Sequence, residues 1–89
     1  MYYTLITGAS QGMGKEMAIK CASLGRNVLL ISLPNENLSN TAATIAENHN
    51  IKTDHLEIDL TKIDSPKKIL DWVKKNSYKV NFLINNAGF

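Results

Sequence analysis

The sequence predicts an α/β domain in which three helices surround a doubly wound parallel sheet of four strands. Apolar runs of strand length alternate with segments of helical periodicity, and such alternation implies a parallel sheet. A glycine-rich turn, with glycines at positions 8, 12 and 14, directly follows the first apolar run. The expected element order is βαβαβαβ, and residues 1–89 form part of one domain.

Composition limits the class of protein. Of the 89 residues, 44% are hydrophobic and 20% are charged, which suits one small globular domain. The net charge of +2 does not indicate a nucleic-acid partner. No apolar run approaches the ~20 residues of a membrane-spanning helix. The single cysteine, Cys21, cannot form an internal disulfide, so we expect a reduced, cytoplasmic protein. With only His49 and His55 as histidines, we expect no metal site.

The first strand and its turn suit a phosphate ligand. The strand, Tyr2 to Thr7, is uncharged and rich in aromatic and β-branched residues. Gly8, Gly12 and Gly14 then allow positive φ and leave room for a ligand to approach. A helix opening there directs free N–H groups and its positive dipole end at the turn, as a pyrophosphate requires. The alternative is a tight turn without a ligand, since the spacing departs from G-x-G-x-x-G.

The next elements follow from apolar periodicity. The first helix ends near Gly25. Asn27 to Leu33 is continuously apolar, as in a strand covered on both faces, and Pro34 interrupts it. The apolar stripe expected for the first helix is Met13, Met17, Ala18, Cys21, Ala22 and Leu24. For the second helix it is Leu38, Ala42, Ile45, Ala46 and His49.

The remaining three elements complete the pattern. Apolar Leu56, Ile58 and Leu60 alternate with polar residues, as in an edge strand. Asp64-Ser65-Pro66 is a helix start with Asp64 as the cap, and Val80 to Ile84 reads as the fourth strand. The stripe expected for the third helix is Ile69, Leu70, Trp72 and Val73, with the nearby lysines in solvent.

We expect the strand order 3-2-1-4, as in the first half of a doubly wound dinucleotide fold. Right-handed crossovers then place the first two helices on one face and the third on the other. The second face carries a single helix, and the fourth strand is an unprotected edge. This exposure predicts a homo-oligomer that forms through the uncovered face or that edge.

Three motifs together carry a family resemblance. Thr7 to Gly14 matches T-G-x-x-x-G-x-G, Asp59-Leu60 supplies an acidic residue after the third strand, and Asn85 to Gly88 reads N-N-A-G. In this order they resemble the short-chain dehydrogenase/reductase family, and the resemblance spans all 89 residues. It implies the N-terminal part of a Rossmann-like dinucleotide-binding domain. The parent enzyme would transfer a hydride between NAD or NADP and an alcohol or carbonyl substrate.

The resemblance also implies roles for the glycine turn. Gly8 and Gly12 would let the backbone approach the cofactor, and Gly14 would allow close packing of helix on strand. Backbone N–H groups near Gly12 and Met13 would face the pyrophosphate, and the Ser10 hydroxyl would add a contact.

The later motifs would contact the rest of the cofactor. Asp59 and the backbone of Leu60 would contact adenine, unless Asp59 only caps N–H groups of its own loop. Asn86, Ala87 and Gly88 would line the cofactor. For Asn85, a structural role is weighed equally with ligand contact.

Cofactor choice is decided near the end of the second strand, where a carboxylate favours NAD and an arginine favours NADP. This chain has Ser32 and Leu33 there, which are neither, although the Ser32 hydroxyl could donate to a 2′-phosphate. Gln11 stands where a basic residue often accompanies NADP use in the family. The choice between NAD and NADP therefore stays open.

No catalytic residue is assigned. The family's catalytic serine, its tyrosine and the lysine four residues later follow N-N-A-G. Here the residues four positions after Tyr2, Tyr3 and Tyr78 are not lysines. We therefore expect these 89 residues to be an inactive cofactor-binding fragment of an oxidoreductase. The alternative is a stand-alone, non-catalytic nucleotide-binding or interaction module.

Overall fold

The computed structural model describes residues 1–86 as four strands and three helices. All neighbouring strands are parallel, and their order is β3-β2-β1-β4. The expected fold class and strand order are therefore confirmed. The elements are β1 (Tyr2–Thr7), α1 (Gly12–Ser23), β2 (Asn27–Ser32), α2 (Leu38–His49), β3 (Thr53–Glu57), α3 (Ser65–Lys75) and β4 (Lys79–Asn85).

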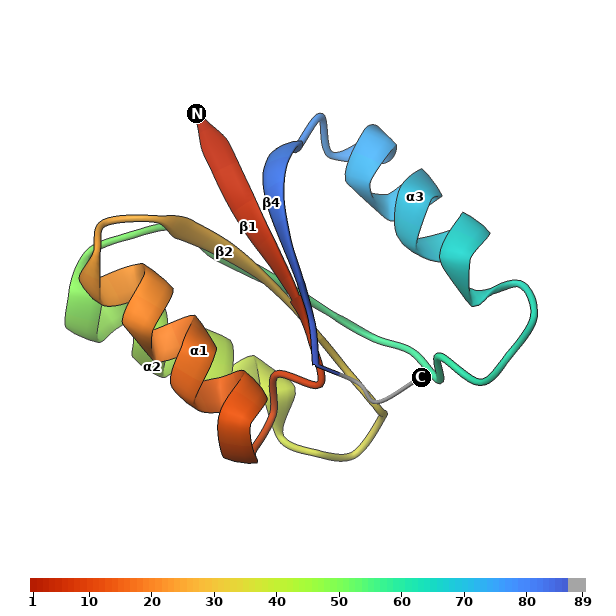
Figure 1. The fold of residues 1–89 in the computed structure, drawn as a ribbon, viewed down its shortest axis with the longest axis horizontal. Coiled ribbons are helices and arrows are strands. Elements are labelled where there is room, and N and C mark those ends of the chain that lie inside the picture. Colours follow the sequence, from red (N-terminus) through yellow and green to blue (C-terminus); the bar gives the residue numbers. More distant parts are fainter. Residues whose placement is uncertain (87–89) are drawn as a thin grey trace.

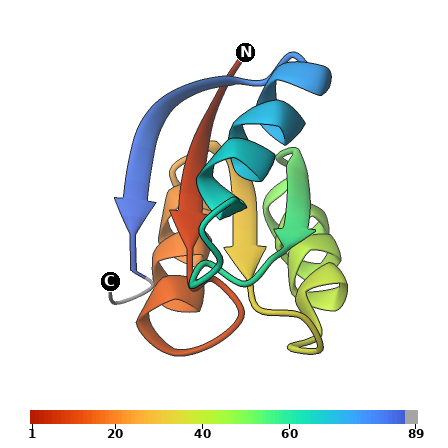
Figure 2. The ribbon, with the colours of Figure 1, turned by 90° about the vertical axis from the view of Figure 1, so that its right-hand side faces the viewer.

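The helices form two unequal layers. Helices α1 and α2 lie together on one face of the sheet and α3 lies on the other, as right-handed crossovers require (Figure 1). The strands run in one direction, so the loops after β1, β2 and β3 gather at one end of the sheet (Figure 2). Among the described residues, no helix is both long and apolar enough to cross a membrane.

Helix α1 packs on the sheet through its smallest residues. Gly14, Ala18 and Ala22, spaced four residues apart, are its buried positions. The expected stripe was wrong at its two ends, because Met13 is 66% exposed and Leu24 is 67% exposed. Because the backbone of α1 lies close to the sheet, the helix face that carries Gly14, Ala18 and Ala22 is the one that packs against it. Met13 then lies about 100° around the helix from Gly14, and Leu24 falls in the C-cap.

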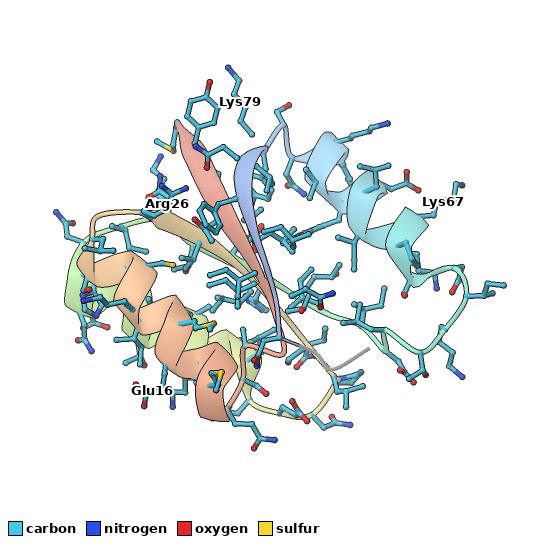
Figure 3. All side chains as sticks on the ribbon, in the orientation of Figure 1. Glu16, Arg26, Lys67 and Lys79 are labelled. Carbon is cyan, nitrogen blue, oxygen red and sulfur yellow. The ribbon has the colours of Figure 1, made fainter. Side chains whose placement is uncertain are left out.

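The ends of β3 and α3 also differ from expectation. Strand β3 ends at Glu57, not at Leu60, because its partner β2 ends at Ser32 and offers no further backbone. Asp64 precedes α3 but makes no side-chain cap hydrogen bond. Its carboxylate instead lies 3.2 Å from the Lys68 ammonium. Lys67, on the same helix, extends away from the sheet (Figure 3).

Strand β4 is the exposed edge that the topology predicted. The register shifts after Tyr3↔Val80, so that Thr4 pairs with Phe82 and Asn81 is an extra residue. Arg26 spans this bulge (Figure 3): Nε donates to Thr4 Oγ1 and Nη2 donates to Asn81 Oδ1, each at 2.7 Å. Its guanidinium also lies 5.5 Å from the centre of the Phe82 ring. Arg26 therefore fastens the start of β4 to β1.

Candidate functional site

A pocket of about 550 Å³ lies at the carboxyl ends of β1, β2 and β3. The loops that follow these strands gather there (Figure 2). Ligands of open α/β sheets bind at this end of the strands. The lining residues are Gly8, Ser10, Gln11, Ser32, Leu33, Glu36, Ile58, Asp59, Leu60, Thr61 and Asn86.

The glycine turn after β1 is closely packed on its inner side. Gly8 and Gly12 have φ of +63° and +59°, in the region that favours glycine. A Cβ on Gly14 would lie 1.9 Å from the Gly8 carbonyl oxygen. A Cβ on Gly12 would meet nothing within 4 Å. Gly14 therefore sets the approach of α1 to β1, whereas Gly12 leaves its surroundings open.

The start of α1 lies beside the pocket and has no side-chain cap among the described residues. Gln11 is the N-cap residue, yet its side chain makes no cap hydrogen bond. The first turn of α1, which the structure describes in full, contains no acidic residue. The helix therefore directs N–H groups and the positive end of its dipole toward the pocket edge without internal compensation. Such an end favours an anion.

Asp59 is held within its own loop. Its Oδ1 accepts hydrogen bonds from the Thr61 hydroxyl at 2.7 Å and from the Thr61 N–H at 2.9 Å. These bonds stabilise the carboxylate and lower the pKa of Asp59 below its ordinary value of 3.8. The capping role that the sequence left open is therefore present. Contact of Asp59 with a ligand stays a prediction, although it lines the pocket together with Leu60.

Two asparagines, Asn85 at the end of β4 and Asn86 directly after it, connect that strand to the end of β1 and the glycine turn. The Thr7 hydroxyl donates to Asn85 Oδ1 at 2.9 Å and accepts the N–H of Asn86 at 3.0 Å. The Asn86 amide lies 3.5 Å from the Gly8 carbonyl oxygen. Asn85 thus has the structural role weighed for it, while Asn86 lines the pocket. Ala87 and Gly88 lie outside the described residues.

The loop after β2 contains a residue that the sequence reasoning missed. The hydroxyl of Ser10, in the glycine turn, donates to the carboxylate of Glu36. The Ser32 hydroxyl is buried and donates to the Leu33 carbonyl at 3.0 Å. Glu36 is the only charged residue between β2 and α2, which is the signal that could have found it. Ile58 and Thr61 were also missed.

The structure brings together most of the residues proposed from sequence. Those that line the pocket are Gly8, Ser10, Gln11, Ser32, Leu33, Asp59, Leu60 and Asn86. Gly12, Met13 and Gly14 instead form the first turn of α1. Within residues 1–86, no three His, Cys, Asp or Glu side chains group closely enough to hold a metal ion.

Comparison with known proteins decides the family. The family model described as short chain dehydrogenase matches residues 3–89. The chain belongs to the short-chain dehydrogenase family. The resemblance read from the three motifs is thereby confirmed.

Members of the short-chain dehydrogenase family resemble the chain over nearly all its length. A very-long-chain 3-oxoacyl-CoA reductase from Yarrowia lipolytica is 40% identical over 97% of this chain and 22% of its own length. A short-chain dehydrogenase/reductase family 16C member 6 from Bos taurus is 38% identical over 94% of this chain and 27% of its own. The chain thus spans about a quarter of the length of these curated relatives.

A solved structure of the family shares the fold. The short-chain dehydrogenase from Sphingobium yanoikuyae in complex with NADPH is 28% identical to this chain, with a TM-score of 0.86. The match covers 100% of this chain and 35% of that one. The strands and helices of this chain therefore have the arrangement found in that short-chain dehydrogenase.

Proposed function

We propose that this chain is the nucleotide-binding part of an NAD(P)-dependent oxidoreductase. The complete protein would transfer a hydride between nicotinamide and an alcohol or carbonyl group. One observation carries the proposal: the pocket joins the loops after three parallel strands to the open N-terminus of α1. That combination suits a dinucleotide whose pyrophosphate lies at the helix start.

The residues present fit such a cofactor. The turn at Gly8 and Gly12 and the uncapped start of α1, with Met13, would hold the pyrophosphate through backbone N–H groups. The adenosine end would extend toward the loops after β2 and β3, where Leu33, Asp59 and Leu60 lie. Asn86, with Ala87 and Gly88 after it, would border the nicotinamide side. The bound cofactor would supply the hydride, and these residues would bind and orient it.

The 89 residues are proposed to bind a nucleotide without turnover. Tyr78, which lies before β4 at the opposite end of the sheet, packs against Tyr3 and Trp72 and donates to the Asp54 carboxylate. Its position and contacts suit a structural role. A cytoplasmic location and association of the chain with a second copy stay predictions.

The experiment is a calorimetric titration of the chain with NAD and with NADP, using Gln11→Glu as the diagnostic variant. A carboxylate at position 11 stabilises the helix start but repels a pyrophosphate, so folding is kept while binding weakens about tenfold. Asn40→Asp is the matched control, because it adds the same charge at the exposed first turn of α2.

The variants separate nucleotide binding from general charge effects. Equal loss of affinity in Gln11→Glu and Asn40→Asp would place the nucleotide elsewhere. Failure of the complete natural protein to bind either nucleotide would refute the proposed function. Turnover of a carbonyl substrate by the 89 residues would refute the proposal that they bind without activity.

A further inference from the structure

We infer that Glu36 recognises the adenosine ribose and makes the protein prefer NAD to NADP. The inference rests on the proposed function and assigns the cofactor choice that Ser32 and Leu33 left open. It concerns a residue four positions beyond the end of β2, outside the segment in which a discriminating side chain is expected from sequence.

The position of Glu36 is fixed from two sides. Its backbone lies in the loop between β2 and α2, and its carboxylate accepts a hydrogen bond from Ser10 in the glycine turn. Both side chains line the pocket. The bond therefore holds a carboxylate between the turn proposed for the pyrophosphate and the loops proposed for adenosine. A ribose that joins those two groups passes this place.

The chemistry of Glu36 suits a hydroxyl and not a phosphate. An ionised carboxylate only accepts hydrogen bonds, and its two oxygens offer about four acceptor sites. The bond from Ser10 uses one of them. The 2′-hydroxyl of NAD can donate to another, whereas the 2′-phosphate of NADP would bring negative charge against negative charge.

Among the described residues that line the pocket, no cationic side chain could balance the negative charge of a 2′-phosphate. The lining side chains include two carboxylates, Glu36 and Asp59, and among these described residues there is neither lysine nor arginine. Leu33, directly after β2, is apolar and 48% exposed. The donor considered for a 2′-phosphate, the Ser32 hydroxyl, is 3% exposed and bonded to its own loop. The pocket therefore favours the nucleotide that lacks the extra phosphate.

This preference would separate the protein from a relative that shares its fold. The Sphingobium yanoikuyae enzyme is in complex with NADPH. Fold similarity alone would therefore transfer the wrong cofactor to this chain, and the side chains of the pocket must decide.

The test is calorimetric titration of the complete natural protein that contains this chain with NAD and with NADP. We expect NAD to bind at least about tenfold more tightly, as repulsion of a phosphate by one nearby carboxylate implies. Glu36→Gln keeps the size and the acceptor for Ser10 but removes the charge. This variant should increase the affinity for NADP about tenfold and change the affinity for NAD only a few-fold. Glu47→Gln, on exposed α2 surface, is the control and should change neither constant.

The outcomes distinguish this inference from the proposed function. Equal affinities for the two nucleotides, or tighter NADP, would overturn the role of Glu36 and leave the proposed function standing. If Glu36→Gln increased the affinities for NAD and NADP by the same factor, the inference would also be overturned, since Glu36 would then weaken the binding of both nucleotides without distinguishing between them. Binding of neither nucleotide would refute both.

Discussion

Gly14 in α1 touches the carbonyl of Gly8 at the end of β1. A Cβ on Gly14 would lie 1.9 Å from that carbonyl oxygen, a separation that no real contact shows. The first turn of the helix and the end of the strand are therefore in backbone contact. This contact places the start of α1 beside the pocket, so the same glycine determines both packing and the position of the anion-attracting helix end.

Gly14→Ala should destabilise the protein by about 2 kcal/mol or more, because either α1 or the Gly8 peptide must move. The loss would appear even though alanine is the better helix former. Urea unfolding measures it. Gly12→Ala is the matched comparison: its positive φ costs about 1 kcal/mol, but its Cβ would meet nothing within 4 Å. Equal losses in the two variants would contradict the packing role of Gly14.

Thr7→Val should loosen β4 from β1. The change keeps the shape of a buried side chain but removes the hydroxyl that donates to Asn85 and accepts the Asn86 N–H. We expect a loss of about 1–3 kcal/mol in the free energy of unfolding, since the Asn86 N–H loses its acceptor. Thr44→Val, at an exposed position of α2, controls for the general effect of valine. Faster amide exchange confined to β4 would support the local cause, and unchanged exchange would oppose it.

Much of this fold is readable from the sequence because β1 and β2 are short apolar runs, each followed by a clear break. The expected bounds of β1 match, and the continuous apolar run of β2 does lie between two covered faces. The end of β3 was not readable. Leu56, Ile58 and Leu60 keep the alternation of a strand, but pairing ends where the neighbouring β2 ends, at Ser32. A partner strand, not a local pattern, determines that boundary.

The candidate site was readable where backbone geometry demands a residue type. Gly8, which has a positive φ, and Asn86, which follows β4, both stand in recognisable motifs, and both line the pocket. Glu36 stands in none, because any residue fits its place in the loop. Only the fold shows that Ser10, 26 residues earlier, holds its carboxylate. A side chain that a tertiary contact holds in the site produces no local sequence pattern that would predict its position.

Stability should fall at alkaline pH through Tyr78. Burial, followed by the hydrogen bond to the Asp54 carboxylate, raises the pKa of Tyr78 well above its ordinary value of 10.0. A group whose pKa is higher in the folded state stabilises the fold fully at pH values below its unfolded-state pKa. This stabilisation is lost as the pH rises from the unfolded-state pKa toward the folded-state pKa. Urea unfolding at pH 8 and pH 11 should therefore show a decline that Tyr78→Phe reduces. An identical decline in both proteins would contradict this role.

The isolated 89 residues should associate through β4. This edge strand exposes Phe82 and Leu83 by 57% and 61%, and a groove of about 570 Å³ lies beside it against α3. Burying such surface is favourable, and unpaired edge groups add hydrogen bonds between copies. Light scattering at micromolar concentration should find dimers or larger species, and Leu83→Lys should shift them toward the ~10 kDa monomer because a buried ammonium is costly. Leu24→Lys is the control, since Leu24 is 67% exposed after α1. Association through this edge would be excluded if the unsubstituted 89 residues were monomeric, or if Leu83→Lys and Leu24→Lys shifted the species toward the monomer equally.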